Sequence, residues 1–198
     1  MAHREWGTPS ADAPTAVVLP GGAYSVRAPL LYWSVELLLQ RGWRVLEVEW
    51  PPSISRSAEP RDGVEQELEA VTATIGGAPR LVVAKSFGSY GLPWSVRNGV
   101  CGVWLTPVLT DPAVHAALAQ AGSSHLAIGG SEDPMWAPAA RLTTRAALHT
   151  VAGADHGILI QHDWEESMRR QQALMAVIAA HVDALQPRAI TGERRHSP

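Results

Sequence analysis

Residues 81–88 read LVVAKSFG, a short apolar strand pattern that runs directly into a predicted helix. A change from strand to helix within so few residues requires a sharp turn, with Ser86 at its centre. Ala84 and Gly88, two positions before and after Ser86, are small enough for the strand and the helix to pack closely there. This pattern exposes the Ser86 hydroxyl at the start of a helix, where it could act as a nucleophile or only cap the helix.

Strand and helix patterns alternate on both sides of this turn. Apolar runs typical of strands occur at residues 16–19, 44–49, 81–84, 100–105, 125–128 and 147–151. Helix patterns occur at residues 30–39, 60–76, 87–97, 113–121, 138–145 and from 163 onward. This alternation predicts an α/β protein, a three-layer α/β/α sandwich with a mostly parallel sheet of about six strands.

Composition bounds the size and the partners of the protein. The 198 residues, 46% of them hydrophobic, predict a single domain over residues 1–187, followed by a disordered polar tail at 188–198. The 16 basic and 19 acidic side chains leave no positive surplus for nucleic acid. No apolar run approaches the roughly 20 residues that span a bilayer. Cys101 is the single cysteine, so no disulfide can form within the chain, which agrees with a reducing compartment. We therefore predict a cytoplasmic protein. We also predict that it has no metal, cofactor, nucleic-acid partner or membrane partner.

A candidate carboxylate partner for a catalytic histidine follows the strand pattern at 125–128. The loop that begins there, GGSEDP at residues 129–134, contains two carboxylates. A carboxylate in such a loop can accept a hydrogen bond from a histidine and hold its ring in place. Asp133 is the preferred candidate, although an aspartate before a proline is also common in turns. Glu132 and Asp111 remain alternatives, and Asp111 has the pattern of a helix cap.

A possible base follows the strand pattern at 147–151. The loop GADHG at residues 153–157 contains His156, and His162 is a nearby competitor. A serine hydroxyl is a poor nucleophile unless a base lies within hydrogen-bonding reach. Ligand sites in open α/β sheets lie at the carboxyl ends of the strands, where loops distant in sequence converge. The order Ser86, Asp133, His156, each after a different strand, therefore predicts acyl transfer to the serine.

These loops resemble those of the α/β-hydrolase superfamily, in particular its compact serine hydrolases without a lid and its dienelactone-hydrolase-like members. The resemblance covers residues 17–184 and includes LPGG at 19–22. It implies a Ser-Asp-His triad that cleaves an ester or thioester of a small molecule through an acyl-enzyme on Ser86. Alternatives are an acyltransferase or cyclase with the same triad, or a binding protein that kept the fold without activity. The substrate and the oligomeric state stay open.

The resemblance also implies where the oxyanion of the reaction would bind. One backbone N–H donor would come from Phe87, and the second from Ala23 or Tyr24.

The surroundings of Ser86 can be predicted from the remaining loops. Residues 106–124 are long enough for one helix but not for a lid. We expect an apolar substrate pocket lined by Tyr24, Trp104, Pro107 and Trp136. Lys85 is expected to point away from this pocket, because successive strand residues alternate between the faces of a sheet.

Overall fold

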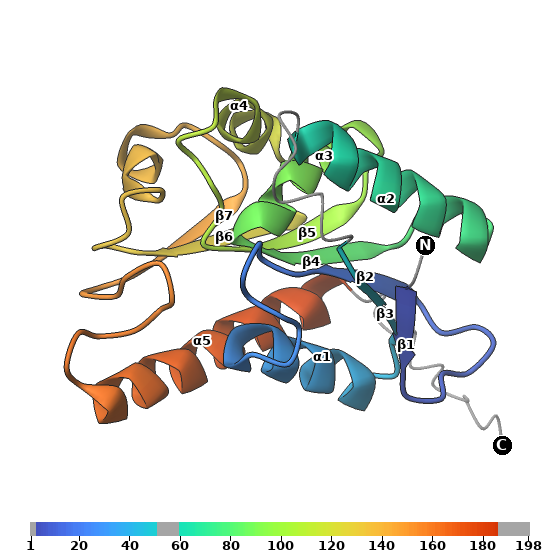
Figure 1. The fold of residues 1–198 in the computed structure, drawn as a ribbon, viewed down its shortest axis with the longest axis horizontal. Coiled ribbons are helices and arrows are strands. Elements are labelled where there is room, and N and C mark those ends of the chain that lie inside the picture. The colour runs from blue at the N-terminus through green and yellow to red at the C-terminus, as the bar shows by residue number, and fades with distance from the viewer. Residues whose placement is uncertain (1–2, 51–59, 186–198) are drawn as a thin grey trace, which may run out of the picture.

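The computed structural model describes residues 3–50 and 60–185, so the predicted tail at 188–198 lies outside the described residues. One sheet has the strand order β1-β3-β2-β4-β5-β6-β7 (Figure 1). All neighbouring strands are parallel except β1, which is antiparallel to β3. The strands are β1 (His3–Trp6), β2 (Thr15–Leu19), β3 (Arg44–Val48), β4 (Leu81–Lys85), β5 (Cys101–Leu105), β6 (His125–Gly130) and β7 (Ala147–Val151). The predicted α/β sandwich is confirmed, and the described sheet contains all six predicted strands plus β1.

Strand β1 was not predicted, because it lies at the edge of the sheet and its four residues are exposed or only half-buried. Side-chain contacts attach it to β3. Trp6 Nε1 donates to Glu47 Oε2 at 2.9 Å, and Arg44 forms an ion pair with Glu5 at 2.9 Å. An edge strand held in this way needs no apolar alternation in its sequence.

Helices cover both faces of the sheet, as Figure 1 shows. Helices α1 (Pro29–Gln40) and α5 (Trp164–Leu185) lie on one face, and α2 (Pro60–Ile75), α3 (Leu92–Arg97) and α4 (Pro112–Gln120) lie on the other. Each layer buries its own apolar cluster, with Val35 and Ile178 in one cluster and Leu68 and Leu118 in the other. None of the helices in the described ranges is long and apolar enough to cross a membrane.

Two segments predicted as α-helices are partly or wholly 3₁₀ helix in the structure. The segment predicted as one helix over 87–97 is a 3₁₀ helix, η2 (Ser86–Gly91), followed by α3. Pro93 lies in the first turn of α3, where a missing N–H costs nothing, so a new helix begins there. The segment predicted over 138–145 contains only the 3₁₀ helix η3 (Ala137–Arg141).

Candidate active site

Ser86 begins η2 immediately after β4 and has a φ angle of +50°. A positive φ is uncommon for residues other than glycine and is a source of backbone strain. Gly88 allows this turn, because a Cβ there would lie 2.6 Å from the carbonyl oxygen of Leu19 and 2.8 Å from its Cβ. The structure thus contains the sharp strand-to-helix turn that the small residues predict.

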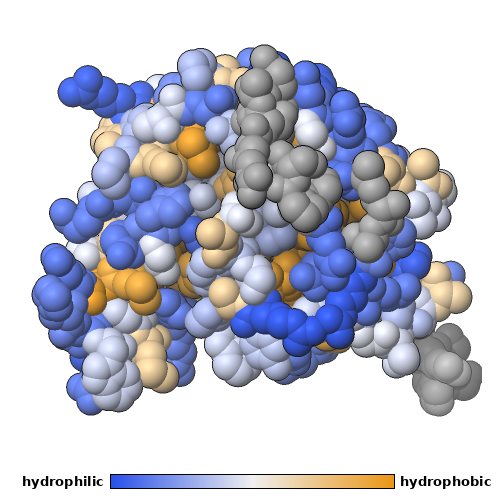
Figure 2. Space-filling view, viewed as in Figure 1, coloured by the Kyte–Doolittle hydropathy of each residue, from blue (hydrophilic) through white to orange (hydrophobic). Residues whose placement is uncertain are grey.

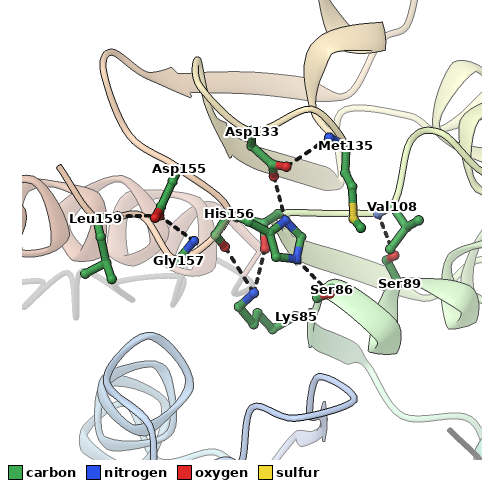
Figure 3. Close-up of polar contacts among 11 residues, drawn as sticks. Lys85, Ser86, Ser89, Val108, Asp133, Met135, Asp155, His156, Gly157 and Leu159 are labelled. Carbon is green, nitrogen blue, oxygen red and sulfur yellow. Dashed lines mark hydrogen bonds and ion pairs between the residues drawn. The ribbon is translucent and has the colours of Figure 1, made fainter. Parts of the chain in front are cut away.

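Three loops bring their polar side chains together at the carboxyl edge of the sheet (Figure 3). His156 Nε2 lies 2.8 Å from Ser86 Oγ, and His156 Nδ1 lies 2.7 Å from Asp133 Oδ2. The imidazole is one-third exposed, whereas the Asp133 carboxylate is fully buried. A bound molecule can therefore reach the serine and the imidazole, while the carboxylate is shielded from water.

The acid loop after β6 holds the Asp133 carboxylate in place. Its second oxygen, Oδ1, accepts a hydrogen bond from the Met135 backbone N–H at 2.9 Å. Gly130 lets this loop approach the histidine loop, because a Cβ there would lie 2.0 Å from the carbonyl oxygen of Ala154. The Glu132 N–H donates to that same carbonyl at 2.9 Å. Both oxygens of the Asp133 carboxylate are thus bonded, which fixes its orientation toward the imidazole.

The histidine loop after β7 is shaped by a residue that the sequence analysis did not single out. Asp155 Oδ1 accepts hydrogen bonds from the N–H groups of Gly157 at 2.7 Å and Leu159 at 3.0 Å. Ile158 has a φ angle of +55°. The aspartate thus stabilises the tight turn that follows His156. An aspartate that bonds the backbone two residues ahead is a known turn signal, so its position beside the histidine could have revealed this role.

The other candidates for acid and base lie elsewhere. Glu132 is exposed and accepts a hydrogen bond from Ser131 Oγ at 3.2 Å. Asp111 caps α4 by accepting from two backbone N–H groups of its first turn, at 2.9 and 3.0 Å. His162 is exposed and lines a groove beside α5. In the described part of the chain, no group of three His, Cys, Asp or Glu side chains is arranged to hold a metal ion.

A cavity of about 300 Å³ surrounds the serine hydroxyl, and its lining includes both candidate residues for the second oxyanion donor. The lining residues are Gly21, Gly22, Ala23, Tyr24, Lys85, Ser86, His156 and Gly157. Within the described ranges, the backbone N–H groups of Ala23 and Phe87 form no hydrogen bond, so both can donate to a bound molecule.

The prediction of the apolar pocket holds for Tyr24, which lines the cavity at Ser86, and is wrong for the other three residues. Trp104 is fully buried, and its Nε1 donates to His125 Nδ1 at 3.1 Å. Trp136 is 3% exposed and donates to Thr150 Oγ1 at 2.9 Å. Pro107 is also buried, and none of the three lines the cavity at Ser86. The two tryptophans pack in the core beneath α2, α3 and α4, where large aromatic rings fill volume.

The expectation that Lys85 points away from the pocket is also wrong. Its position does follow the alternation of β4, since Leu81 and Val83 face α1 and α5. The side chain is long enough, however, for its ammonium group to return to the end of the strand. Lys85 consequently lines the cavity together with Ser86, although it is only 3% exposed.

An exposed apolar surface lies beside the cavity. Leu159, Trp164 and Met168 are 47%, 70% and 63% exposed, and together they line a groove of about 540 Å³. Figure 2 shows hydrophobic surface over the connection between β7 and α5. A Cβ on Gly157, which lines the cavity, would lie 3.2 Å from the Leu159 side chain. The cavity at Ser86 thus borders this apolar surface through Leu159, and the Asp155 carboxylate lies equally close, since its Oδ1 would be 3.2 Å from the same Cβ.

Solved structures share this fold across nearly the whole chain. A predicted CIB-like hydrolase from Thermoplasma acidophilum is 12% identical, with a TM-score of 0.67 over 90% of this chain and 91% of that one. A serine hydrolase without a lid from Xanthomonas campestris is 15% identical, with a TM-score of 0.64 over 91% and 88%. Dienelactone hydrolase from Anabaena variabilis is 16% identical, with a TM-score of 0.60 over 89% and 88%.

The chain therefore has the α/β-hydrolase fold. No family model and no curated protein matches the sequence itself. Between β5 and β6 the only helix is α4, so no lid is inserted at that position.

Proposed function

We propose that this protein is a serine hydrolase that cleaves an ester or thioester of a small molecule through an acyl-enzyme on Ser86. The proposal rests on the continuous hydrogen-bonded chain from Ser86 Oγ through His156 to Asp133, with links of 2.8 and 2.7 Å. A nucleophile, a base in contact with it and a buried carboxylate behind the base are the parts that acyl transfer requires.

In the first half of the reaction, Ser86 Oγ attacks the carbonyl carbon and His156 Nε2 takes the hydroxyl proton. Asp133 accepts the hydrogen bond from Nδ1–H and stabilises the imidazolium that forms. The backbone N–H of Phe87 and that of Ala23 or Tyr24 would bind the negative oxygen of the tetrahedral intermediate. His156 then gives its proton to the departing alcohol or thiol, and the acyl group remains on the serine.

In the second half, a water molecule attacks the acyl-enzyme while His156 Nε2 takes its proton. The imidazolium returns that proton to Ser86 Oγ as the carboxylic acid leaves, so the enzyme is regenerated. The cavity of about 300 Å³ is at the small end of the range for ligand pockets, which favours a short acyl group.

Labelling with a fluorophosphonate probe tests the nucleophile directly. The wild-type protein should be labelled and should hydrolyse p-nitrophenyl acetate, whereas Ser86→Ala should do neither and should melt at the same temperature. Ser25→Ala removes another serine from the loop beside the cavity and serves as the matched control. Absence of labelling in the wild type, or equal labelling of Ser86→Ala, would overturn the proposal and favour a binding protein with this fold.

A further inference from the structure

Lys85 is the only lysine in the chain, although the chain carries 16 lysine and arginine residues in all. It directly precedes Ser86 and is only 3% exposed. A basic residue that serves solubility or a surface ion pair lies at the protein surface. In this chain every other basic residue of the lysine and arginine type is an arginine. The single lysine is therefore placed where its particular shape and chemistry matter.

The ammonium group of Lys85 contacts three other loops, and Figure 3 shows its hydrogen bond to the backbone of His156. Its Nζ donates to Thr106 Oγ1 at 3.0 Å and to the backbone carbonyl oxygen of His156 at 3.1 Å. It also lies 4.9 Å from the ring centroid of Tyr24. These partners follow β5, β7 and β2, so one side chain joins the histidine loop and the loop of the expected oxyanion donor to the end of β4.

The Lys85 ammonium group could either bind an anionic group of a substrate or hold the protein's own loops in place. Its hydrogen-bond partners distinguish between these two roles. An ammonium group has three N–H donors. Two donate to Thr106 and His156, and the charge faces the Tyr24 ring, an arrangement of the cation–π type. Lys85 is thus fully engaged by the protein and is not a free cation for an anionic substrate group.

Burial of the Lys85 cation lowers the stability of the folded protein, so stability does not explain why a lysine occupies this position. In the described ranges no carboxylate forms an ion pair with Nζ. A buried charge without such a partner is costly, and an apolar side chain of similar length would fill the same space without that cost. Burial accordingly lowers the pKa of Lys85 to about 8, although the negative charges of Asp133 and Asp155 oppose this effect.

We propose that Lys85 is a positioning residue, whose ammonium group holds the backbone of His156 and the ring of Tyr24 against the end of β4. The contact with the His156 carbonyl fixes the residue whose imidazole lies 2.8 Å from Ser86 Oγ. Loss of the contact would let the imidazole move, and displacement by about 1 Å can cost roughly 10²-fold in rate. This inference rests on the proposed function.

The protonation state of Lys85 should then limit the reaction at high pH. The titratable groups that face Nζ are Tyr24 from the loop after β2, Asp133 from the loop after β6, and Asp155 and His156 from the loop after β7. Because the pKa of Lys85 is lowered to about 8, the cation and its contact with the Tyr24 ring are present below this pH and lost above it. We expect kcat to fall above about pH 8.

Three variants of the full chain test the proposal. Lys85→Met keeps most of the length of the side chain but removes the charge, so kcat should fall by about 10²-fold with little change in KM. Lys85→Arg restores a cation that does not titrate in this range and should recover part of the activity without the fall above pH 8. Arg80→Lys, at an exposed position before β4, is the matched control and should keep the wild-type pH profile.

A spectroscopic measurement keeps this test separate from that of the proposed function. Incorporation of lysine labelled with ¹³C at Cε gives a single resonance, whose titration follows Lys85 directly. The low-field proton of the His156–Asp133 hydrogen bond should shift or broaden in Lys85→Met even if the protein hydrolyses nothing. An unchanged low-field proton in Lys85→Met would overturn the proposal, as would a wild-type kcat and pH profile in an active protein. If Lys85→Met does not fold, the wild-type protein is used instead: the low-field proton should shift or broaden as the Lys85 resonance titrates near pH 8, and an unchanged low-field proton would overturn the proposal.

Discussion

His125 gives the protein a predictable sensitivity to acid. It begins β6 at the edge of the sheet opposite Ser86, is 4% exposed, and accepts a hydrogen bond from Trp104 Nε1 at 3.1 Å. Burial, and to a lesser degree the nearby charge of His181, lowers the pKa of His125 from 6.5 to about 4. The folded protein therefore holds this imidazole in its neutral form.

The size of the effect follows from that pKa. Below pH 6.5 the unfolded chain binds a proton at this histidine, whereas the folded chain does not until about pH 4. Each pH unit within this window lowers the free energy of unfolding by about 1.4 kcal/mol. His125 alone should thus remove about 3 kcal/mol of stability as the pH falls through the window, and it has no such effect above pH 6.5. A loss of this size is a large fraction of the roughly 5–15 kcal/mol that stabilises a typical domain.

Urea unfolding at pH 7 and pH 4.5 measures this contribution. His125→Gln keeps a hydrogen-bond acceptor for Trp104 but cannot bind a proton, so the stability difference between the two pH values should shrink by about 2–3 kcal/mol. His115→Gln on α4 is the matched control and should keep the wild-type difference. If His125→Gln loses as much stability in acid as the wild type, the neutral buried histidine is not the cause and the reasoning fails.

Three further substitutions test the architecture of the site. Asp133→Asn should lower kcat by about 10⁴-fold, as loss of the orienting carboxylate does in serine proteases, while the exposed neighbour Glu132→Gln should stay near the wild-type kcat. Gly88→Ala should destabilise the protein by about 1–3 kcal/mol in urea unfolding and slow fluorophosphonate labelling, because its Cβ would lie 2.6 Å from the Leu19 carbonyl oxygen. Trp104→Phe should lower the melting temperature through loss of a buried hydrogen bond and leave KM unchanged, since this ring is fully buried and does not line the cavity at Ser86.

The central strands could be predicted from sequence because parallel strands are covered by helices on both faces. Strand β4 is buried along its whole length, and the four residues before Lys85 form a continuous apolar run. Strand β1 could not be predicted from apolar spacing, because its side chains at the sheet edge are exposed or half-buried and make polar contacts such as Glu5 with Arg44. The sequence pattern also predicts a single helix across residues 87–97, where the structure has η2 followed by α3. A 3₁₀ helix and an α-helix have similar apolar spacing over so short a segment, so the pattern does not distinguish them.

The meeting of the three polar side chains of the candidate site could be predicted for a different reason. Parallel strands bring their carboxyl ends to one edge, so Ser86, Asp133 and His156 needed only to follow three strands in order to meet. The pocket could not be predicted in this way. Whether Trp104 faces a loop or the core depends on which face of β5 it occupies and on what packs there, and neither is encoded within the strand itself. The unusual position of Lys85 could have been suspected from composition, because it is a single lysine among many arginines and it directly precedes Ser86.

Two adjacent residues carry costs that packing alone does not explain. Ser86 has a φ angle of +50°, a conformation that costs about 1–3 kcal/mol for residues other than glycine. Lys85 places a charge in the protein interior, where no carboxylate of residues 3–50 and 60–185 forms an ion pair with it. A chain that used this fold only as a scaffold would gain stability by relaxing either residue. Both costs lie at the end of β4, beside the 2.8 Å contact between the Ser86 hydroxyl and the His156 imidazole. Strain at this edge of the sheet is what the proposed catalytic function would require.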